Sequence, residues 1–375
     1  MENIVEPQEK KNTLKFVGKG SQLFAIDLVN TVLTIITLGF YYPWAKARRL
    51  KYVYQHSDLA GSKFDFLGTG KEIFRGFIKA ILILIPIYVF LLLFNLYVGQ
   101  IAENEILLGV FIALLVMLVF VGLPIFIAYA IFGTFRYRLA RSLWRGILCA
   151  FDAKKSDFIK SYLKAFYFFF LTYAVMMGLM VGVTFLQKHN GGDTGTLVFA
   201  LVSMTLMLPL SVLLIYSSAW YRNKLYAITL GNIRLGDLRL RYTGKAGTLF
   251  GIMILGGILT LMTLGIYYFW YKKNLYNFLV TNLRLEQNET PSQLSSTITA
   301  GKVFRLEVGN LLLLIFTLGL AYSWVYCRVA RFIANNVVLP EEINVDAIKQ
   351  TETNYNANTT GEGLFSMMDL GGIFF

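Results

Sequence analysis

The chain has few of the residues that build metal centres, disulfide frameworks and soluble surfaces. Its 375 residues contain two Cys, two His and seven Pro, and only 15% of them are charged. Two cysteines leave no room for a disulfide framework or a cysteine metal site, and His56 and His189 do not make a histidine-rich centre. The low charge, 56% hydrophobic residues and a mean hydropathy of +0.57 are typical of a polytopic membrane protein.

Motifs of the common enzyme classes are also lacking. There is no Walker loop, GxSxG, HExxH or CxxC, and the glycine pairs at residues 18–20 and 68–70 lack the ending of a nucleotide-binding loop. No nucleic-acid module accompanies the basic segments. We therefore expect no enzyme, catalytic residue, cofactor, metal or nucleic-acid partner.

Four segments are long enough to cross about 30 Å of hydrocarbon as helices. They cover residues 80–98, 106–135, 165–187 and 194–221, and contain no Asp, Glu, Lys or Arg. Three further apolar segments are shorter or interrupted, at residues 23–45, 248–271 and 303–327. The expected fold is an α-helical polytopic membrane protein with internal repeats, about four clear spans and three broken apolar helices.

The basic residues predict the orientation, because basic loops are retained in the cytoplasm. Residues 46–75, 136–164 and 222–247 hold 21 of the 35 Lys and Arg residues. We expect these segments and the acidic C-terminal tail to be cytoplasmic. The net charge of +13 is then a signal of topology before it is a signal of binding.

Internal repeats are the most informative feature. LTIITLGFYYPW (residues 33–44) aligns without a gap on LTLMTLGIYYFW (259–270) and LLIFTLGLAYSW (313–324). A fourth, partial copy contains a tryptophan in the same register but no TLG. The repeat positions are Thr37, Gly39, Trp44, Trp220, Thr263, Gly265, Trp270, Thr317, Gly319 and Trp324. The unit at residues 136–158 departs from this pattern, because Trp144 is out of register and the TLG is missing.

Each repeat predicts the same local structure. An apolar helix ends at the TLG, because glycine weakens helices and readily caps them. Tyrosine and tryptophan follow at the membrane surface, and a short basic helix continues along the interface. Residues 57–68 and 232–244 then alternate apolar with polar residues around a glycine, which predicts small cytoplasmic β-hairpins.

These motifs resemble the YjgN-like family of bacterial inner-membrane proteins, whose function is unknown. The resemblance rests on the TLG, Tyr, Trp and basic-helix unit, on the aromatic-glycine strand behind it, and on the closing sequence GEGLFSMMDLGGIFF. It implies a multi-pass protein of the bacterial inner membrane and carries over no functional residues. The expected organisation is a flexible N-terminus (1–13), a repeat-built membrane domain (14–339) and an acidic, largely disordered C-terminal tail (340–375).

Polar residues within the apolar segments are candidate intramembrane sites. They are Asp27, Asn30, Arg305, Glu307 and Asn310. Asn30 and Asn310 occupy equivalent places, seven residues before the TLG threonine, where the second copy has Gly256. These side chains either form hydrogen bonds between helices or line an ion or substrate pathway. We further expect Asp27 and Arg305, from the first and last repeats, to form an ion pair.

The direction of the TLG segments follows from their flanks. If all seven apolar segments cross the membrane, LKFVGKG (14–20) lies outside and LRYTGKA (240–246) inside; if the TLG segments re-enter, both lie on one side. The similarity of the two sequences favours one side. We therefore expect the TLG segments to enter and leave on the cytoplasmic side, with Gly39, Gly265 and Gly319 at the turns.

Two functions remain open from the sequence. Repeats, broken helices and intramembrane polar groups favour a transporter or channel-like protein for a small solute or a lipid. Basic interfacial helices favour a membrane scaffold that binds anionic lipid or a protein partner. Membrane lipids, anionic ones above all, are the expected partners in either case, and a homo-oligomer is compatible with both.

Overall fold

The computed structural model describes residues 13–102, 104–189, 194–287 and 290–350, and this part of the chain is mostly helical. Of residues 1–13, expected to form a flexible N-terminus, only residue 13 is within the described part. The helices are α1 Gly20–Ile36, α2 Tyr42–Gln55, α3 Gly70–Ala102, α4 Glu105–Met117, α5 Leu123–Ala140, α6 Lys155–His189, α7 Thr194–Thr229, α8 Ala246–Met262, α9 Tyr268–Thr281, α10 Ala300–Phe316 and α11 Tyr322–Asn336. Single turns are η1 Leu118–Gly122, η2 Leu230–Asn232 and η3 Val345–Ala347.

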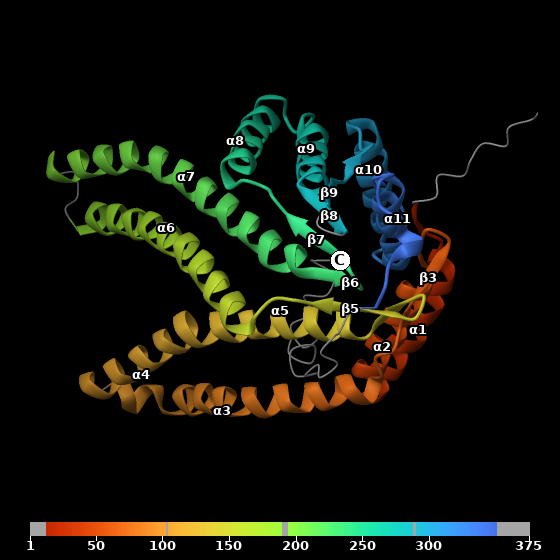
Figure 1. Ribbon diagram of the computed structural model, residues 1–375. Helices are drawn as coiled ribbons and strands as arrows, with labels where there is room; N and C mark the ends of the chain where they lie inside the picture. Colours follow the sequence, from red (N-terminus) through yellow and green to blue (C-terminus); the bar gives the residue numbers. More distant parts are fainter. Residues whose placement is uncertain (1–12, 103, 190–193, 288–289, 351–375) are drawn as a thin grey trace, which may run out of the picture.

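Within the described residues, four helical segments are long and apolar enough to cross a membrane, as the sequence predicted. They are Gly70–Tyr97, Ile106–Ala140, Lys155–Gly182 and Met204–Asn232. The π-helical turn η1 joins α4 and α5 in one continuous segment, which pairs with α3, while α6 pairs with α7. Helices α3, α6 and α7 have 33, 35 and 36 residues, so each is about 50 Å long. These two long hairpins project to the left in Figure 1.

The three TLG segments form short helical hairpins instead of single helices. The pairs α1/α2, α8/α9 and α10/α11 lie together on the right and at the top of Figure 1. Their first helices have 17 residues each, about 25 Å, and the chain reverses at the TLG in every case. The segments expected at 23–45, 248–271 and 303–327 are therefore each split between two antiparallel helices.

One antiparallel sheet connects the first four helical hairpins and leads into the fifth. Its nine strands follow chain order: β1 Leu14–Phe16, β2 Ser57–Leu59, β3 Ser62–Phe66, β4 Ser142–Trp144, β5 Ile147–Phe151, β6 Ile233–Leu235, β7 Leu238–Tyr242, β8 Leu283–Gln287 and β9 Thr290–Gln293. A second, two-stranded sheet pairs β10 Ser295–Ser296 with β11 Val337–Val338. The β-hairpins predicted at residues 57–68 and 232–244 are present. Residues 142–151 form an equivalent hairpin although the repeat motif is missing there.

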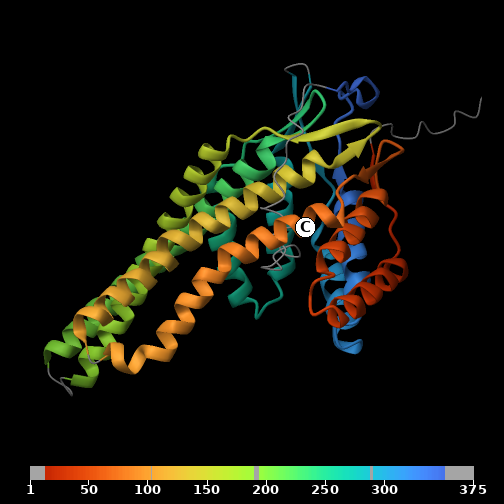
Figure 2. The ribbon, with the colours of Figure 1, turned by 90° about the horizontal axis from the view of Figure 1, so that it is seen from below.

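The chain thus alternates helical hairpins with β-hairpins. Four of the helical hairpins start and end at strands of the nine-stranded sheet, and the fifth, α10/α11, starts at β10 and ends at β11 of the two-stranded sheet. The view in Figure 2 shows the long hairpins leaving together in one direction, with the short hairpins grouped beside their bases. The basic segments at 46–75, 136–164 and 222–247 all lead into this one sheet.

A segment after α11 packs against the sheet. Ile343, Val345 and Ile348 are 5–7% exposed and form a core with residues of the β-hairpins. Asp346 pairs with Arg145 at 2.6 Å. Cys149 lies in the same core, where burial raises the pKa of its thiol to about 12. Residues 340–350, expected as the start of a disordered tail, are therefore ordered, because their apolar side chains complete the core. Residues 351–375 lie outside the described part.

The helices pack in a closed cyclic order. The first helix of each hairpin contacts the second helix of the preceding one, and α1 contacts α11, which brings the two ends of the membrane domain together. The same joint recurs at two of these contacts. The Trp44 ring lies 5.1 Å from Phe74 and against Gly70, and the Trp324 ring lies 4.9 Å from Phe24 and against Gly20. Glycine is needed there, since a Cβ at Gly20 would lie 2.8 Å from Trp324 Cα.

We expect Gly20→Ala to weaken the joint between α1 and α11, because the added methyl group overlaps the Trp324 backbone and ring. Overpacking of this kind costs about 1–3 kcal/mol. Gly301→Ala is the matched control, since Gly301 lies in the first turn of α10 with open space around it. Thermal unfolding in detergent should show a lower melting temperature for Gly20→Ala only. Equal melting temperatures for the two variants would contradict the joint.

Candidate functional site

The three TLG turns, residues 37–39, 263–265 and 317–319, have the same hydrogen bonds. The Thr37 hydroxyl donates to Leu33 O at 2.7 Å and accepts from the Tyr41 amide at 2.9 Å. The Gly39 amide donates to Thr34 O at 2.7 Å, a contact typical of a Schellman cap. Equivalent bonds of 2.6–3.0 Å recur around Thr263 and Thr317. The backbone amides of each turn, from the threonine to the residue four positions later, therefore all have acceptors within the hairpin.

The leucine of each turn is exposed and has an unfavourable backbone conformation. Leu38, Leu264 and Leu318 have φ angles of 50°, 50° and 49°, in the left-handed region that L-residues populate at a cost of about 1–2 kcal/mol. Their side chains are 90–95% exposed. A polar residue or glycine would suit an aqueous turn better. Strained, apolar and exposed residues at three equivalent positions indicate a functional constraint.

Asn30 and Asn310 lie where the two helices of a short hairpin cross. Asn30 is 5% exposed, and its Nδ2 donates to Ala45 O at 3.3 Å. The same crossing in the second hairpin pairs Gly256 with the Tyr271 ring, so a small residue faces a large one there. The amide oxygens of Asn30 and Asn310 have no hydrogen-bond partner in the described part of the chain. This place in the hairpin therefore combines a packing role with a buried acceptor.

The predicted ion pair between Asp27 and Arg305 is wrong. Asp27 Oδ2 lies 3.6 Å from Arg49 Nη1 and accepts a hydrogen bond from Ser323 Oγ at 2.7 Å. The first and last repeats do meet, but α11 is the helix that contacts α1, so Asp27 faces a residue of α11. Arg305 lies on the exposed side of α10.

Glu307 is the true counterpart of Asp27, since both lie ten residues before the TLG threonine. Its carboxylate lies 3.9 Å from Lys272 Nζ on α9. Asp27 and Glu307 therefore lie at different helix contacts, Arg305 is exposed, and the structure does not bring the candidate polar residues into one site. No group of His, Cys, Asp and Glu among the described residues could hold a metal.

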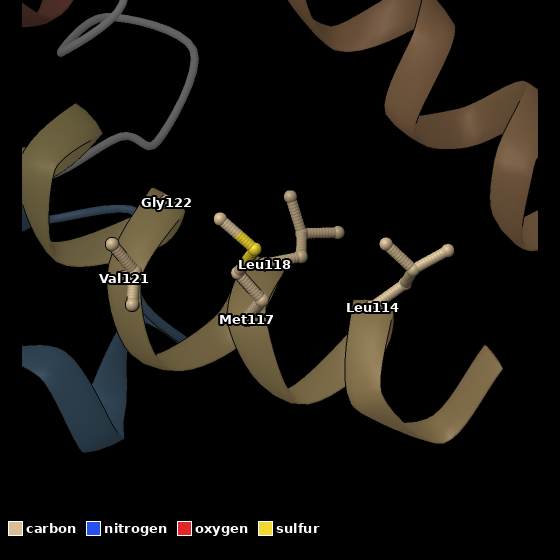
Figure 3. Close-up of a pocket in the computed structure, with 5 residues that line it drawn as sticks. All are labelled: Leu114, Met117, Leu118, Val121 and Gly122. Atoms are coloured by element: carbon tan, nitrogen blue, oxygen red, sulfur yellow. The ribbon is translucent and has the colours of Figure 1, made fainter. Parts of the chain in front are cut away.

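An apolar hollow of about 280 Å³ lies on the first long hairpin, where α4 continues into the π-helical turn η1. Figure 3 shows its lining residues, Leu114, Met117, Leu118, Val121 and Gly122. No polar side chain lines it, so it is suited to a hydrocarbon chain and offers no group for chemistry.

The contact of α1 and α2 with α11, which we call the seam, contains residues that were missed in the sequence. Arg49 lies 5.3 Å and 5.0 Å from the ring centroids of Tyr322 and Tyr326. A signal was present, because Arg49 replaces a residue that is Leu275 and Val329 in the other copies. A charged residue where the repeat is otherwise apolar marks a position with its own role.

We expect Asp27→Ala to lower stability by about 1–3 kcal/mol, because it removes a charge-assisted hydrogen bond and leaves Arg49 unbalanced. The effects of Asp27→Ala and Ser323→Ala should be non-additive, by about 0.5 kcal/mol or more, since the side chains touch. The losses of stability caused by Asp27→Ala and by Arg305→Ala should be additive. Thermal unfolding of the single and double variants in detergent measures the additivity of each pair. Coupling of Asp27 to Arg305 but not to Ser323 would refute this geometry.

Comparison with known proteins connects this geometry to a family. The family model described as "Bacterial protein of unknown function (DUF898)" matches residues 11–155, 148–293 and 274–367. The inner membrane protein YjgN of Salmonella typhimurium is 25% identical over 380 residues, which cover 92% of each chain. YjgN of Escherichia coli K12 is 38% identical over 71 residues, 19% of this chain and 18% of that protein. No solved structure matches the chain significantly.

The four apolar helices and the inner-membrane relatives identify a membrane protein. The three family matches together span nearly the whole sequence, which agrees with its repeated construction. The chain therefore belongs to the YjgN-like DUF898 family of bacterial proteins of unknown function.

Proposed function

We propose that this protein binds lipids of the cytoplasmic leaflet of the inner membrane, by inserting its three short hairpins into that leaflet only. The observation that carries the proposal is the TLG turn. Each turn provides acceptors for its own amides and presents an exposed leucine. Pairing of the amides lowers the cost of placing an irregular backbone in hydrocarbon.

The lengths of the hairpins support insertion to half depth. Nine residues, about 13 Å of helix, separate Asp27 from the end of α1 at Ile36, and the same number separates Glu307 from Phe316. The hydrocarbon of one leaflet is about 15 Å thick, half of the whole core. The apolar ends beyond these charged residues therefore fit one leaflet, whereas the long hairpins are long enough to cross both.

The basic segments support the cytoplasmic side. All three lead into the nine-stranded sheet from which the first four helical hairpins leave. Positive charge is retained in the cytoplasm, so the sheet, the TLG hairpins' bases and the ordered segment before residue 350 would share that side. Anionic lipid would be held there by the basic helices that follow each turn.

Transport of a small solute or a lipid is the second candidate. It is favoured by the buried amide oxygens of Asn30 and Asn310, which lack a partner among the described residues. The spanning windows have only 0–11% of their residues buried. A pathway would therefore have to form between copies of the chain or between protein and lipid. Uptake into proteoliposomes that is lost in the double variant Asn30→Ala, Asn310→Ala would favour this candidate over lipid binding.

We expect the three turns to reside in hydrocarbon. Single cysteines at Leu38, Leu264 and Leu318, in a background with Cys149 and Cys327 replaced by Ala, would carry an environment-sensitive fluorophore in proteoliposomes. Acyl-chain nitroxides should quench all three labels, whereas iodide should quench only a control label at Lys63→Cys on the exposed side of β3. Iodide quenching of the turns equal to that of the control would contradict leaflet insertion.

A further inference from the structure

The seam holds a guanidinium group in a preorganised place. Arg49 on α2 lies over the rings of Tyr322 and Tyr326 on α11, at 5.3 Å and 5.0 Å from their centroids. Its side chain is 27% exposed, so it is largely enclosed and yet accessible. Asp27 lies on one side at 3.6 Å. Contact with two rings restrains the position of the guanidinium and leaves its N–H donors for a ligand.

The hydrogen-bond donors of this cluster lack acceptors within the described residues. The contact of Arg49 with Asp27 is too long for a hydrogen bond, and Arg49 forms none with another described side chain or carbonyl. The hydroxyl groups of Tyr322 and Tyr326 also form no hydrogen bond with another described residue. A guanidinium and two hydroxyls that converge without acceptors form an arrangement that suits an oxyanion.

The charge of the surroundings is positive. Arg49 and Arg138 both act electrostatically on Tyr326, and Arg331 acts on the adjacent Cys327. Arg331 also donates to Gly18 O at 2.7 Å. Asp27 is the acidic residue that acts on the same part of α11, and Ser323 donates a hydrogen bond to it. Arg49 and Arg331 against the single carboxylate of Asp27 leave a net positive charge that can receive an anion.

Comparison of the repeats shows which residues of this cluster are shared by all three hairpins and which occur in one copy only. Tyr322 has Tyr42 and Tyr268 at the equivalent places, so it belongs to the common hairpin. Arg49 corresponds to Leu275 and Val329 and has no charged counterpart. Tyr326 is likewise replaced, by lysine, in the other two copies. The cluster therefore occurs once, where the last hairpin meets the first.

We propose that the seam binds a phosphate group, presented by an anionic phospholipid of the cytoplasmic leaflet, through Arg49 with Tyr322 and Tyr326. The inference rests on the proposed lipid-binding function and names its ligand class. A planar guanidinium binds two phosphate oxygens at once, and a pocket of arginines between membrane helices suits such a headgroup. The acyl chains would extend along the apolar ends of α1 and α11.

The test measures lipid binding to the full, delipidated protein in detergent. Phosphatidylglycerol and phosphatidylethanolamine are added in turn, and bound lipid is counted by native mass spectrometry. Arg49→Gln should weaken retention of phosphatidylglycerol by about tenfold or more, the loss expected for a charge-assisted bidentate contact. Arg48→Gln is the matched control, because Arg48 is the exposed neighbour on the same helix and carries the same charge. It should change retention by less than about twofold.

In a second experiment, inorganic phosphate takes the place of the lipid, and calorimetry measures its binding. Displacement of phosphatidylglycerol by phosphate from the wild type, absent in Arg49→Gln, would support the phosphate site. Binding of phosphate at Arg49 without any preference for phosphatidylglycerol would assign the site to a soluble phosphate, and so overturn the lipid as the source. Equal losses in Arg48→Gln and Arg49→Gln, or no loss in either, would overturn the site.

Folding is controlled with the double variant Asp27→Asn, Arg49→Gln, which removes both charges of the pair. It should melt within a few degrees of the wild type and still fail to retain phosphatidylglycerol. Retention restored in this double variant would contradict a direct role for Arg49. The depth of a label at Leu38 does not depend on Arg49, so leaflet insertion can be judged separately from the phosphate site.

Discussion

Hydrocarbon offers no partner to a polar backbone group, and this constraint explains the most repeated element of the structure. A chain that reverses direction inside a leaflet, as we propose for the short hairpins, needs acceptors for its own amides. The TLG turn supplies them with one threonine hydroxyl and a glycine cap, while its leucine is exposed. The strained left-handed conformation recurs at Leu38, Leu264 and Leu318, because each of these positions needs an apolar side chain and a left-handed backbone together.

The sheet and the cyclic helix contacts turn separate hairpins into one body. None of the hairpins could bury its polar base alone, and the strands between them provide that base with a common hydrogen-bonded support. The Trp324 and Gly20 joint closes the circle between the last hairpin and the first. The segment around Val345 fills the core of the sheet. A cluster of arginines arises at this closure because the meeting helices come from different repeats, whose sequences have diverged.

Much of this architecture could be predicted from the sequence, and the remainder depends on contacts that sequence periodicity does not encode. Apolar length gave the four long helices, and the recurrence of Thr37, Gly39 and their equivalents gave the three turns. The ion partner of Asp27 could not be found, because alignment of repeats shows which residues are equivalent and not which helices touch. Ordering of residues 340–350 was missed for a related reason. A short polar segment with scattered isoleucine and valine looks disordered until the core that receives it is known.

The most direct test of the account is the sidedness of three positions in intact cells. A membrane-impermeant maleimide added from outside should label Asn104→Cys at the far end of the first long hairpin. It should label Lys63→Cys on the sheet only after the membrane is opened. Leu318→Cys should react in neither case, since the account places it in hydrocarbon. Labelling of Leu318→Cys from outside would mean that the short hairpins cross the membrane, and would contradict insertion into one leaflet.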